Sequence, residues 1–512
     1  MAGPMPQRAG DAIALSLVSH TNAGKTTLAR TLLGRDVGTV RDAPHVTEFA
    51  DVFEMLRTES GEALLLWDTP GFGDSVRLAR RLRQSDNPIG WLLTQVWDRF
   101  RDRALWASQQ AVRNVRDEAD VVLYLVNASE SPQAAAYVAP EMEVLRWIGK
   151  PVVVLLNQLG APGNTPAEEA DVQRWRTHLA PHAQVRAVLP LDAFARCWVQ
   201  EGVLLRTLAG VLEGPARARM QRLEAAWRAR REATLEASAA ALAASLARTA
   251  AQRVDVADAG GLGERLKRAG EVLAGTIGQA VGAGNARSGS PADAASRELA
   301  ERWDAEVRAS THELMSLHGL GGEAHGEILQ QLAGRTEVKL RLDEGRAAVW
   351  GGMVTGALAG LKADLASGGL TLGGGLLAGG LLGALGAAGV ARGVNLVRGT
   401  QQSWVAWNTQ ALGQMLEAAL LRYLAVAHFG RGRGDWRPTE TPSRWAEVVA
   451  EAVRAQGAAL QDVWALRAPA RPGAPGTAAP EAMAEGLQAA LQPLVHALLR
   501  EVLERLYPPS AG

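Results

Sequence analysis

Short apolar runs separated by polar and Gly-rich turns fill the first 190 residues, and they predict the strands of a sheet. Such runs lie at 13–18, 64–67, 121–126, 151–156 and 183–189. Most are continuous, which is typical of parallel strands buried on both faces. Segment 49–56, a turn at Ser60-Gly61 and the run at 63–67 favour an antiparallel edge. Helical periodicity between the runs completes an α/β domain, mostly parallel, which we expect to span residues 1–212.

Helical periodicity dominates the rest of the chain. A long helix is expected at 216–253, and others at 262–281, 294–315, 403–428, 442–466 and 481–506. Gly-, Pro- or Ala-rich linkers lie at 282–291, 430–434 and 467–479. We therefore interpret 213–346 as a helical stalk region and 399–512 as a C-terminal helical region.

Residues 347–398 form an apolar segment with a regular glycine spacing. Glycines recur every fourth residue at 352, 356 and 360, and again at 375, 379 and 383. Because glycine costs roughly 1 kcal/mol against alanine inside a helix in water, this repetition favours helices that pack closely in a membrane. Arg341 and Arg346 precede the apolar stretches, which end at Ala391, and Arg392 and Arg398 follow them, which predicts a hairpin with cytoplasmic ends. The alternatives are a soluble helical pair or a mobile Gly-rich loop.

Composition narrows the function classes. The 512 residues carry a formal net charge of zero, so no strong nucleic-acid signal exists, and a single cysteine excludes a disulfide scaffold. The first ten residues have no apolar core and do not form a secretory signal. Arginine far exceeds lysine, which is typical of a GC-rich bacterial genome. These features indicate a cytoplasmic bacterial protein.

The segment Ser-His-Thr-Asn-Ala-Gly-Lys-Thr at 19–26 follows the first predicted strand and precedes a helix. It matches the phosphate-binding pattern G-x-x-x-x-G-K-[ST], except that Ser19 replaces the first glycine. Lys25 is expected to reach the β- and γ-phosphates, and the Thr26 hydroxyl to ligate magnesium. The alternative is a chance Gly-Lys-Thr in a surface turn. The predicted nucleotide-binding residues of this loop are Ser19, Thr21, Asn22, Ala23, Gly24, Lys25, Thr26 and Thr27.

A second motif, Asp68-Thr-Pro-Gly71, ends the apolar run at 64–67. It places the Asp68 carboxylate beside the magnesium and the Gly71 N–H where it can sense the γ-phosphate. Thr47 is the candidate for the threonine that closes over the magnesium, with Thr39 as the reserve. The predicted magnesium ligands are thus Thr26, Thr47 and Asp68, and the predicted catalytic residues are Lys25, Thr47 and Gly71.

With Asn22 in the loop and the D-T-P-G form of the second motif, the chain resembles the Era/TrmE-like branch of translation-factor-related P-loop GTPases, the 50S ribosome-binding type. The resemblance implies GTP and GDP with Mg²⁺ as ligands, and GTP hydrolysis as the activity. Phe72 stands where Ras-like proteins carry the glutamine that orients the attacking water, so we expect slow intrinsic hydrolysis.

The guanine-reading motif departs from that family. The family pattern N-K-x-D is met by Asn157, but Gln158 and Gly160 replace the lysine and the aspartate. Because the missing aspartate reads guanine, the preference for GTP over ATP is left open. Asp192, followed by Ala193 after the run at 183–189, is our hypothesis for a substitute base reader. The alternative is that Asp192 caps the next helix.

The helical tail with its Gly-rich stretch resembles a bacterial family defined by the domain of unknown function 3482. This resemblance rests on overall layout and on segments such as 421–434, Leu-Arg-Tyr-Leu-Ala-Val-Ala-His-Phe-Gly-Arg-Gly-Arg-Gly. We interpret the chain as a nucleotide-dependent switch whose GTPase domain acts on a helical domain at the inner face of the cell membrane, with the lipid bilayer contacted through 347–398 and with homo-oligomers as partners. The alternatives are a ribosome-assembly GTPase, a dynamin-like membrane-remodelling machine, and a nucleotide-binding scaffold with little hydrolysis.

Overall fold

The computed structural model describes residues 11–20, 23–33, 51–72, 75–94, 103–157, 165–191, 198–256, 291–320, 394–398, 403–428, 443–467 and 480–507. The chain forms two compact units. The first comprises residues 1–234 with 427–443 and 507–512, and the second comprises 235–426 and 444–506.

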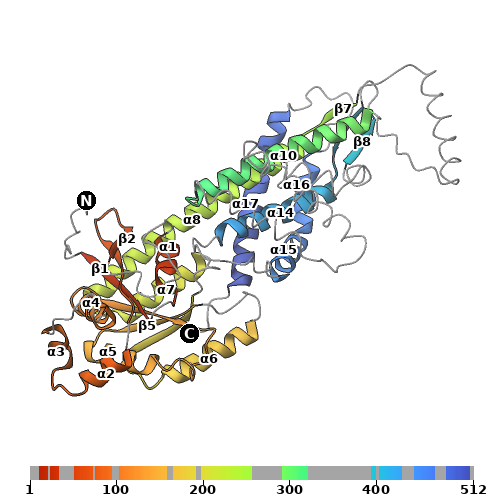
Figure 1. The fold of residues 1–512 in the computed structure, drawn as a ribbon. Coiled ribbons are helices and arrows are strands. Elements are labelled where there is room, and N and C mark those ends of the chain that lie inside the picture. Colours follow the sequence, from red (N-terminus) through yellow and green to blue (C-terminus); the bar gives the residue numbers. More distant parts are fainter. Residues whose placement is uncertain are drawn as a thin grey trace, which may run out of the picture. The chain divides into compact units, whose positions relative to one another are not determined.

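A six-stranded sheet organises the first unit (Figure 1). Its strands are β1 (Ala12–Ser19), β2 (Asp51–Arg57), β3 (Ala63–Asp68), β4 (Val121–Asn127), β5 (Val152–Asn157) and β6 (Val185–Pro190), in the order β2-β3-β1-β4-β5-β6. All neighbours pair in parallel except β2 and β3. The predicted α/β fold class with one antiparallel edge strand is therefore confirmed.

Alternate side chains of the central strands enter two separate cores, as the period of two in a strand requires. Val122, Tyr124 and Val126 of β4 face one core, whereas Leu123 and Leu125 face the other. The first core is closed by α2 (Ser75–Leu82), α3 (Pro88–Thr94), α4 (Arg103–Asp117), α5 (Val138–Ile148) and α6 (Thr165–Leu179). The second is closed by α1 (Lys25–Leu33), α7 (Trp198–Val211) and α8 (Gly214–Ala251). The result is a three-layer αβα sandwich.

Helix α8 extends the first unit beyond the boundary expected at residue 212. Its side chains Met220 and Leu223 are buried in the core that α1 and α7 cover. For this reason residues up to Thr234 belong to the first unit, and the rest of the helix belongs to the second. The predicted long helix at 216–253 is confirmed almost to the residue.

The second unit is mostly helical. Beyond α8 it contains α10 (Pro291–Leu317), α14 (Thr409–Ala427), α15 (Ser443–Ala455), α16 (Gly457–Ala465) and α17 (Pro480–Leu506). Buried side chains of α17 recur three or four residues apart, at Leu487, Leu491, Val495 and Leu498, as on one face of an amphipathic helix. Arg422 of α14 donates to Val307 O on α10 at 3.0 Å, and burial lowers its pKa to about 10.

A three-stranded antiparallel sheet in this unit corrects the sequence analysis. Strands β7 (Val254–Val256), β8 (Val394–Arg398) and β9 (Ser403–Trp407) pair in the order β7-β9-β8. The prediction of one helix over 403–428 is wrong for its first five residues, and the last five residues of the segment 347–398 form a strand. Val405 pairs with Val254, about 150 positions earlier, so local periodicity does not reveal the partner.

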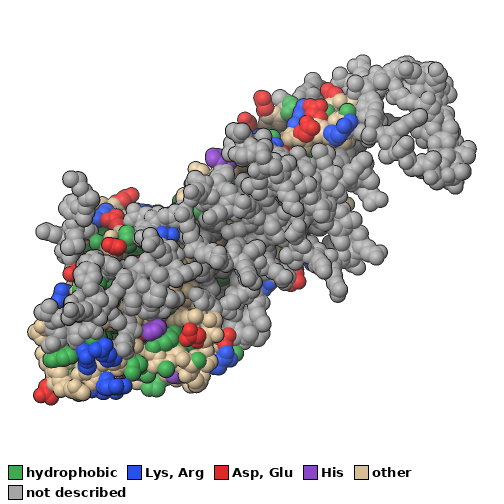
Figure 2. All heavy atoms as spheres, in the orientation of Figure 1, with side chains coloured by type: hydrophobic (Ala, Val, Ile, Leu, Met, Phe, Trp, Pro, Cys, Tyr) green, Lys and Arg blue, Asp and Glu red, His purple; other side chains and the backbone are tan. Residues whose placement is uncertain are grey.

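The rest of the apolar segment, 347–393, lies outside the described residues, as does the helix expected at 262–281. Among the described residues, no helix combines the length and apolar character that crossing a bilayer requires. On the face drawn in Figure 2, basic side chains of the described residues are interspersed with acidic and apolar ones. This mixture agrees with the formal net charge of zero.

Truncating a side chain at the centre of the sheet should destabilise the first unit. Leu123 is 0% exposed and pairs in register with Leu17 and Val153. We expect Leu123→Ala to lower the free energy of unfolding by about 2–5 kcal/mol, because it removes buried methyl groups and leaves a cavity. Urea unfolding of the full chain, followed by tryptophan fluorescence, measures this. Val76→Ala is the control, because Val76 is 49% exposed. Equal effects of the two substitutions would contradict this account of the core.

Candidate functional site

The phosphate-binding loop, residues 19–26, joins the end of β1 to the start of α1. It lies at the carboxyl edge of the sheet, where ligands bind in open α/β folds. Gly24 has a φ of +90°, and a Cβ there would lie 2.9 Å from Asn157 Nδ2. A side chain at this position would strain the backbone and displace Asn157, so the loop needs glycine here.

Lys25 is held beside the residue that departs from the motif. Its Nζ donates to Ser19 Oγ at 3.2 Å, and Ser19 is buried. Although Lys25 is partly exposed as a residue, burial of its ammonium lowers its pKa, and the negative charges of Asp68 and Glu141 oppose that shift. Ser19 therefore fits the position of the first glycine and contributes an oxygen that contacts the lysine.

Thr26 and Asp68 meet as the sequence predicts for a magnesium site. Thr26 Oγ1 donates to Asp68 Oδ2 at 2.9 Å. Asp68 is 3% exposed, and its Oδ1 is buried with no hydrogen-bond partner among the described residues. Burial raises the pKa of Asp68 to about 6, while Lys25 and the Thr26 hydrogen bond oppose the rise. A hydroxyl and a carboxylate with an unpaired oxygen are the donors that Mg²⁺ prefers, so these residues fit the ion.

The D-T-P-G turn is fixed against the end of β1. Thr69 Oγ1 donates to Leu17 O at 2.6 Å, and Phe72 N donates to Ser19 O at 3.0 Å. Gly71 therefore lies next to the phosphate-binding loop, as the sequence predicts. The Phe72 ring is 0% exposed and packs in the core on the α2–α6 face of the sheet. Its side chain is thus committed to packing.

Asn157 braces the loop from the neighbouring strand. Its Nδ2 donates to Ala23 O at 3.1 Å, and the residue is buried at the end of β5. Thr27 is buried in the first turn of α1. The other predicted site residues, Thr21, Asn22, Thr47, Gln158, Asp192 and Ala193, lie outside the described residues, as do Thr39 and Gly160.

Sequence reasoning missed a buried carboxylate behind the loop. Glu141 of α5 is 0% exposed, and its Oε1 lies 2.8 Å from His20 Nδ1. Tyr124 OH donates to Glu141 Oε2 at 2.6 Å. The local sequence Glu-Met-Glu resembles a solvated helix face, so the only available signal was the burial of β4, which directs Tyr124 inward.

Two parts of the chain match known protein families. Residues 14–158 match the family described as 50S ribosome-binding GTPase, and residues 335–489 match the family described as domain of unknown function 3482. The first match contains the phosphate-binding loop, the D-T-P-G turn and Asn157. The second covers much of the region beyond α10.

Individual proteins are also similar to part of the chain. The chain is 26% identical to GTPase Era of Heliobacterium modesticaldum over 145 residues, which are 28% of this chain and 39% of that protein. It thus spans well under half the length of this curated relative. Among solved structures, Aquifex aeolicus Era bound to GDP and AlF4⁻ is 18% identical with a TM-score of 0.31, covering 40% of this chain and 58% of its own. An Era in complex with MgGDPNP and a segment of 16S ribosomal RNA has a TM-score of 0.30, with the same identity and coverages.

The motif residues, their geometry and the family match agree. Residues 14–158 form a P-loop GTPase domain that is similar to the 50S ribosome-binding GTPase family and to Era, and residues 335–489 match the domain of unknown function 3482.

Proposed function

We propose that this protein binds and slowly hydrolyses GTP with Mg²⁺, and that its nucleotide state is passed to the helical unit through α8. The observation that supports binding of GTP and Mg²⁺ is the hydrogen bond from Thr26 to Asp68. Asp68 is close enough to Lys25 for the lysine's charge to act on its pKa, and it begins the D-T-P-G turn that Gly71 ends. Lys25 binds the β- and γ-phosphates, and Thr26 and Asp68 hold the ion. When bound, Mg²⁺ supplies positive charge that stabilises the phosphate oxygens during transfer.

The slow intrinsic rate follows from Phe72. A glutamine at this position orients the attacking water in Ras-like proteins. The apolar ring here is buried in the core and presents no hydrogen-bonding atom. Hydrolysis then depends on Lys25, the ion and the Gly71 main chain, with acceleration by a partner, a cation or a second copy of the chain.

Guanine recognition is assigned to residues after β6. Asn157 is committed to Ala23 O, and neither Gln158 nor Gly160 provides the carboxylate that the family uses. Asp192 and Ala193 follow Leu191, which donates its N–H to Leu156 O at 3.0 Å. This bond holds Leu191 at the carboxyl end of β5, the edge that carries the phosphate-binding loop, which supports an assignment of guanine recognition to the residues that follow Leu191.

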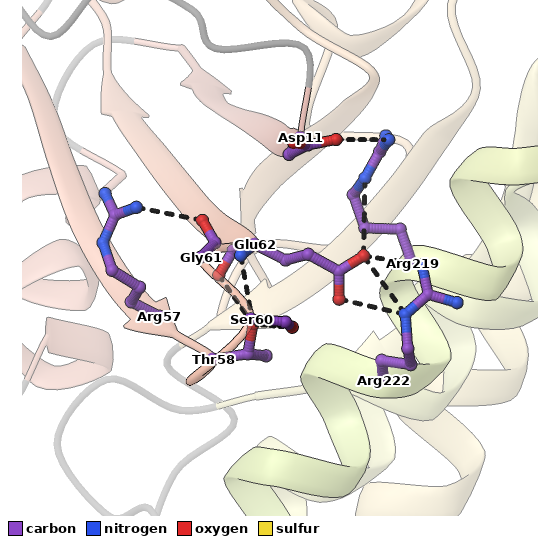
Figure 3. Close-up of polar contacts among 8 residues, drawn as sticks. All are labelled: Asp11, Arg57, Thr58, Ser60, Gly61, Glu62, Arg219 and Arg222. Atoms are coloured by element: carbon purple, nitrogen blue, oxygen red, sulfur yellow. Dashed lines mark hydrogen bonds and ion pairs between the residues drawn. The ribbon is translucent and has the colours of Figure 1, made fainter.

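The coupling to α8 is supported by an ion-pair cluster at the β2–β3 hairpin. Figure 3 shows Glu62, at the end of the hairpin turn, pointing toward Arg219 and Arg222 of α8. Arg222 donates to the Glu62 carboxylate through Nη2 at 2.6 Å and Nε at 3.0 Å, and this hydrogen bonding lowers the pKa of Glu62. Arg219 Nε lies 3.9 Å from Glu62, and its Nη2 lies 3.4 Å from Asp11.

The hairpin turn is built to present Glu62. Thr58 N donates to Glu62 O at 2.9 Å, and Gly61 has a φ of +91°, which closes the turn. A second contact lies farther along α8, where Arg230 Nη2 donates to Arg57 O at 2.5 Å. The helix thus contacts both ends of the turn that joins β2 to β3.

This hairpin connects the two nucleotide-sensing segments. Residues 34–50, which hold Thr47, lead into β2, and β3 ends at Asp68, directly before the turn that contains Gly71. A nucleotide-driven shift of either strand therefore acts directly on α8 through charged contacts.

We extend the proposal to a membrane contact through 347–398, to homo-oligomers, and to a cytoplasmic location at the inner face of the cell membrane.

Ribosome association is a second candidate, favoured by the description of the matched family. Cosedimentation of the full chain with ribosomal subunits, compared with cosedimentation with liposomes, distinguishes ribosome association from membrane association. Nucleotide-dependent binding to ribosomal subunits, without binding to liposomes, would favour ribosome association.

Removing the magnesium ligand should weaken metal-dependent GTP binding. We expect Asp68→Asn to lower GTP affinity in magnesium by roughly ten- to a hundredfold, because it removes the charge that holds the ion. Calorimetry with and without EDTA measures this: chelation should weaken wild-type binding strongly and the variant little. Lys25→Ala sets the hydrolysis baseline. Asp117→Asn is the control, because Asp117 pairs with Arg116 at the end of α4. Wild-type turnover at the Lys25→Ala level would contradict the enzymatic proposal.

Guanine preference should depend on Asp192. We expect the full chain to bind GTP more tightly than ATP, and Asp192→Ala to reduce that ratio roughly tenfold or more, since a buried polar edge of the base loses its partner. Competition binding with a fluorescent guanine nucleotide measures both affinities. Asp171→Ala is the control, because Asp171 pairs with Arg174 within α6. A ratio that stays the same in Asp192→Ala would refute this assignment.

Reversing a charge on α8 should uncouple it from the hairpin. We expect Arg222→Glu to leave GTP affinity within about twofold of wild type, because repulsion acts on the hairpin turn and not on the phosphate site. Hydrogen exchange over 214–234 should lose its difference between GDP and a GTP analogue. The double variant Glu62→Arg/Arg222→Glu should restore it.

The control for this experiment is Arg228→Glu on the same helix, because Arg228 pairs with Glu224 within α8. If Arg222→Glu kept the wild-type nucleotide response in α8, the ion-pair cluster would not be the route of coupling.

A further inference from the structure

Glu141 is a buried carboxylate that the proposed nucleotide chemistry does not use. Burying a carboxylate is unfavourable unless hydrogen bonds compensate it, and burial raises the pKa of Glu141. Compensation comes from His20 Nδ1 at 2.8 Å and Tyr124 OH at 2.6 Å, with a further hydrogen bond from Ser75. These partners come from the phosphate-binding loop, from β4 and from α2. Glu141 therefore joins three elements that surround the site.

His20 connects Glu141 to the main chain of the D-T-P-G turn. It is the second residue of the phosphate-binding loop, and its ring stacks on Tyr137 with centroids 4.3 Å apart and an interplanar angle of 16°. The main chain of His20 pairs with Phe72 in an isolated parallel bridge, and Phe72 N donates to Ser19 O at 3.0 Å. The His20 side chain thus anchors the segment against which Gly71 and Phe72 lie.

Helix α5, which carries Glu141, also fixes the chain that follows the D-T-P-G turn. Ser75 begins α2, three residues after Phe72, and hydrogen-bonds Glu141. Beyond the other end of α2, Arg83 Nε donates to both Glu143 oxygens at 3.0 Å. Helix α5 therefore holds both ends of α2 through Glu141 and Glu143. The turn that contains Gly71 is anchored before it by Thr69 and after it by Ser75.

We propose that His20 and Glu141 are positioning residues that hold the Gly71 main chain in register with the phosphate-binding loop, so that the γ-phosphate is detected and GTP is hydrolysed. The proposal rests on the function proposed above. GDP lacks the γ-phosphate, and its β-phosphate is bound by Lys25 and the loop. Disrupting the pair therefore affects GTP turnover and the discrimination between GTP and GDP, and leaves GDP affinity nearly unchanged.

The test uses His20→Ala in the full chain. The His20 side chain is 32% exposed, so truncation removes no buried apolar side chain, although Glu141 loses one of its partners. We expect kcat for GTP hydrolysis to fall about tenfold or more, and the ratio of the Kd for GDP to the Kd for GppNHp to fall about tenfold, while the Kd for GDP changes less than about twofold. Asn at position 20 places an amide N–H near the position of Nδ1, so His20→Asn should recover most of both losses.

Controls separate this proposal from folding and from the enzymatic proposal. His182→Ala, between α6 and β6, should match wild type, and thermal unfolding should show His20→Ala folded. Should His20→Ala be unfolded, Glu141→Gln replaces it. The amide keeps the volume but has one acceptor oxygen for two donors, His20 Nδ1 and Tyr124 OH, and its NH2 faces one of them, so the same loss of discrimination is expected. A GDP affinity that falls in step with GTP, or unchanged discrimination, overturns the positioning role. If wild-type turnover equals that of Lys25→Ala, hydrolysis itself fails, and the GppNHp ratio still decides this proposal.

Discussion

Charge compensation at the carboxyl edge of the sheet is the constraint on which this site depends. Burial lowers the pKa of Lys25, and the negative charges of Asp68 and Glu141 oppose that shift. Asp68 comes from β3, whereas Glu141 comes from α5, which packs on one face of the sheet. Each carboxylate is also hydrogen-bonded to a different element: Asp68 accepts from Thr26 of α1, and Glu141 is bonded to His20 of the loop and to Tyr124 of β4. Breaking these bonds would leave a buried charge without partners, which is costly. The site and the sandwich are therefore held by the same groups.

Elements that depend on short stretches of sequence can be predicted from the sequence, whereas contacts between distant residues cannot. The central strands are continuous apolar runs, and the phosphate-binding loop and D-T-P-G turn have fixed spacing, so β1, β3, β4, β5 and the Thr26–Asp68 pair follow from the chain alone. Glu141 does not, because its partner His20 is 121 positions away and its neighbours resemble a solvated helix face. The β7-β9-β8 sheet is missed for the same reason: β9 is too short to show a period, and its partners are distant.

The structure gives each of three motif residues, Ser19, Phe72 and Asn157, a specific role. Ser19 replaces a glycine, yet its hydroxyl contacts Lys25 and is accommodated in the buried end of β1. Phe72 stands where Ras-like proteins carry a glutamine, and its side chain is part of the core, so the turn has apolar anchorage here and no side chain that could orient water. Asn157 matches the family pattern and donates to Ala23 O in the loop, an interaction that does not involve the base.

The packing of α8 on the first unit also determines where an autonomous folding unit ends. A fragment stopping at residue 212 would lose Met220 and Leu223, and it would expose the apolar faces of α1 and α7 that these side chains cover. The carboxylate of Glu62 would lose both of its arginine partners at the same time. Such a fragment is expected to aggregate or to lose thermal stability for reasons unrelated to nucleotide chemistry. The first unit includes α8 as far as Thr234, in the middle of that helix.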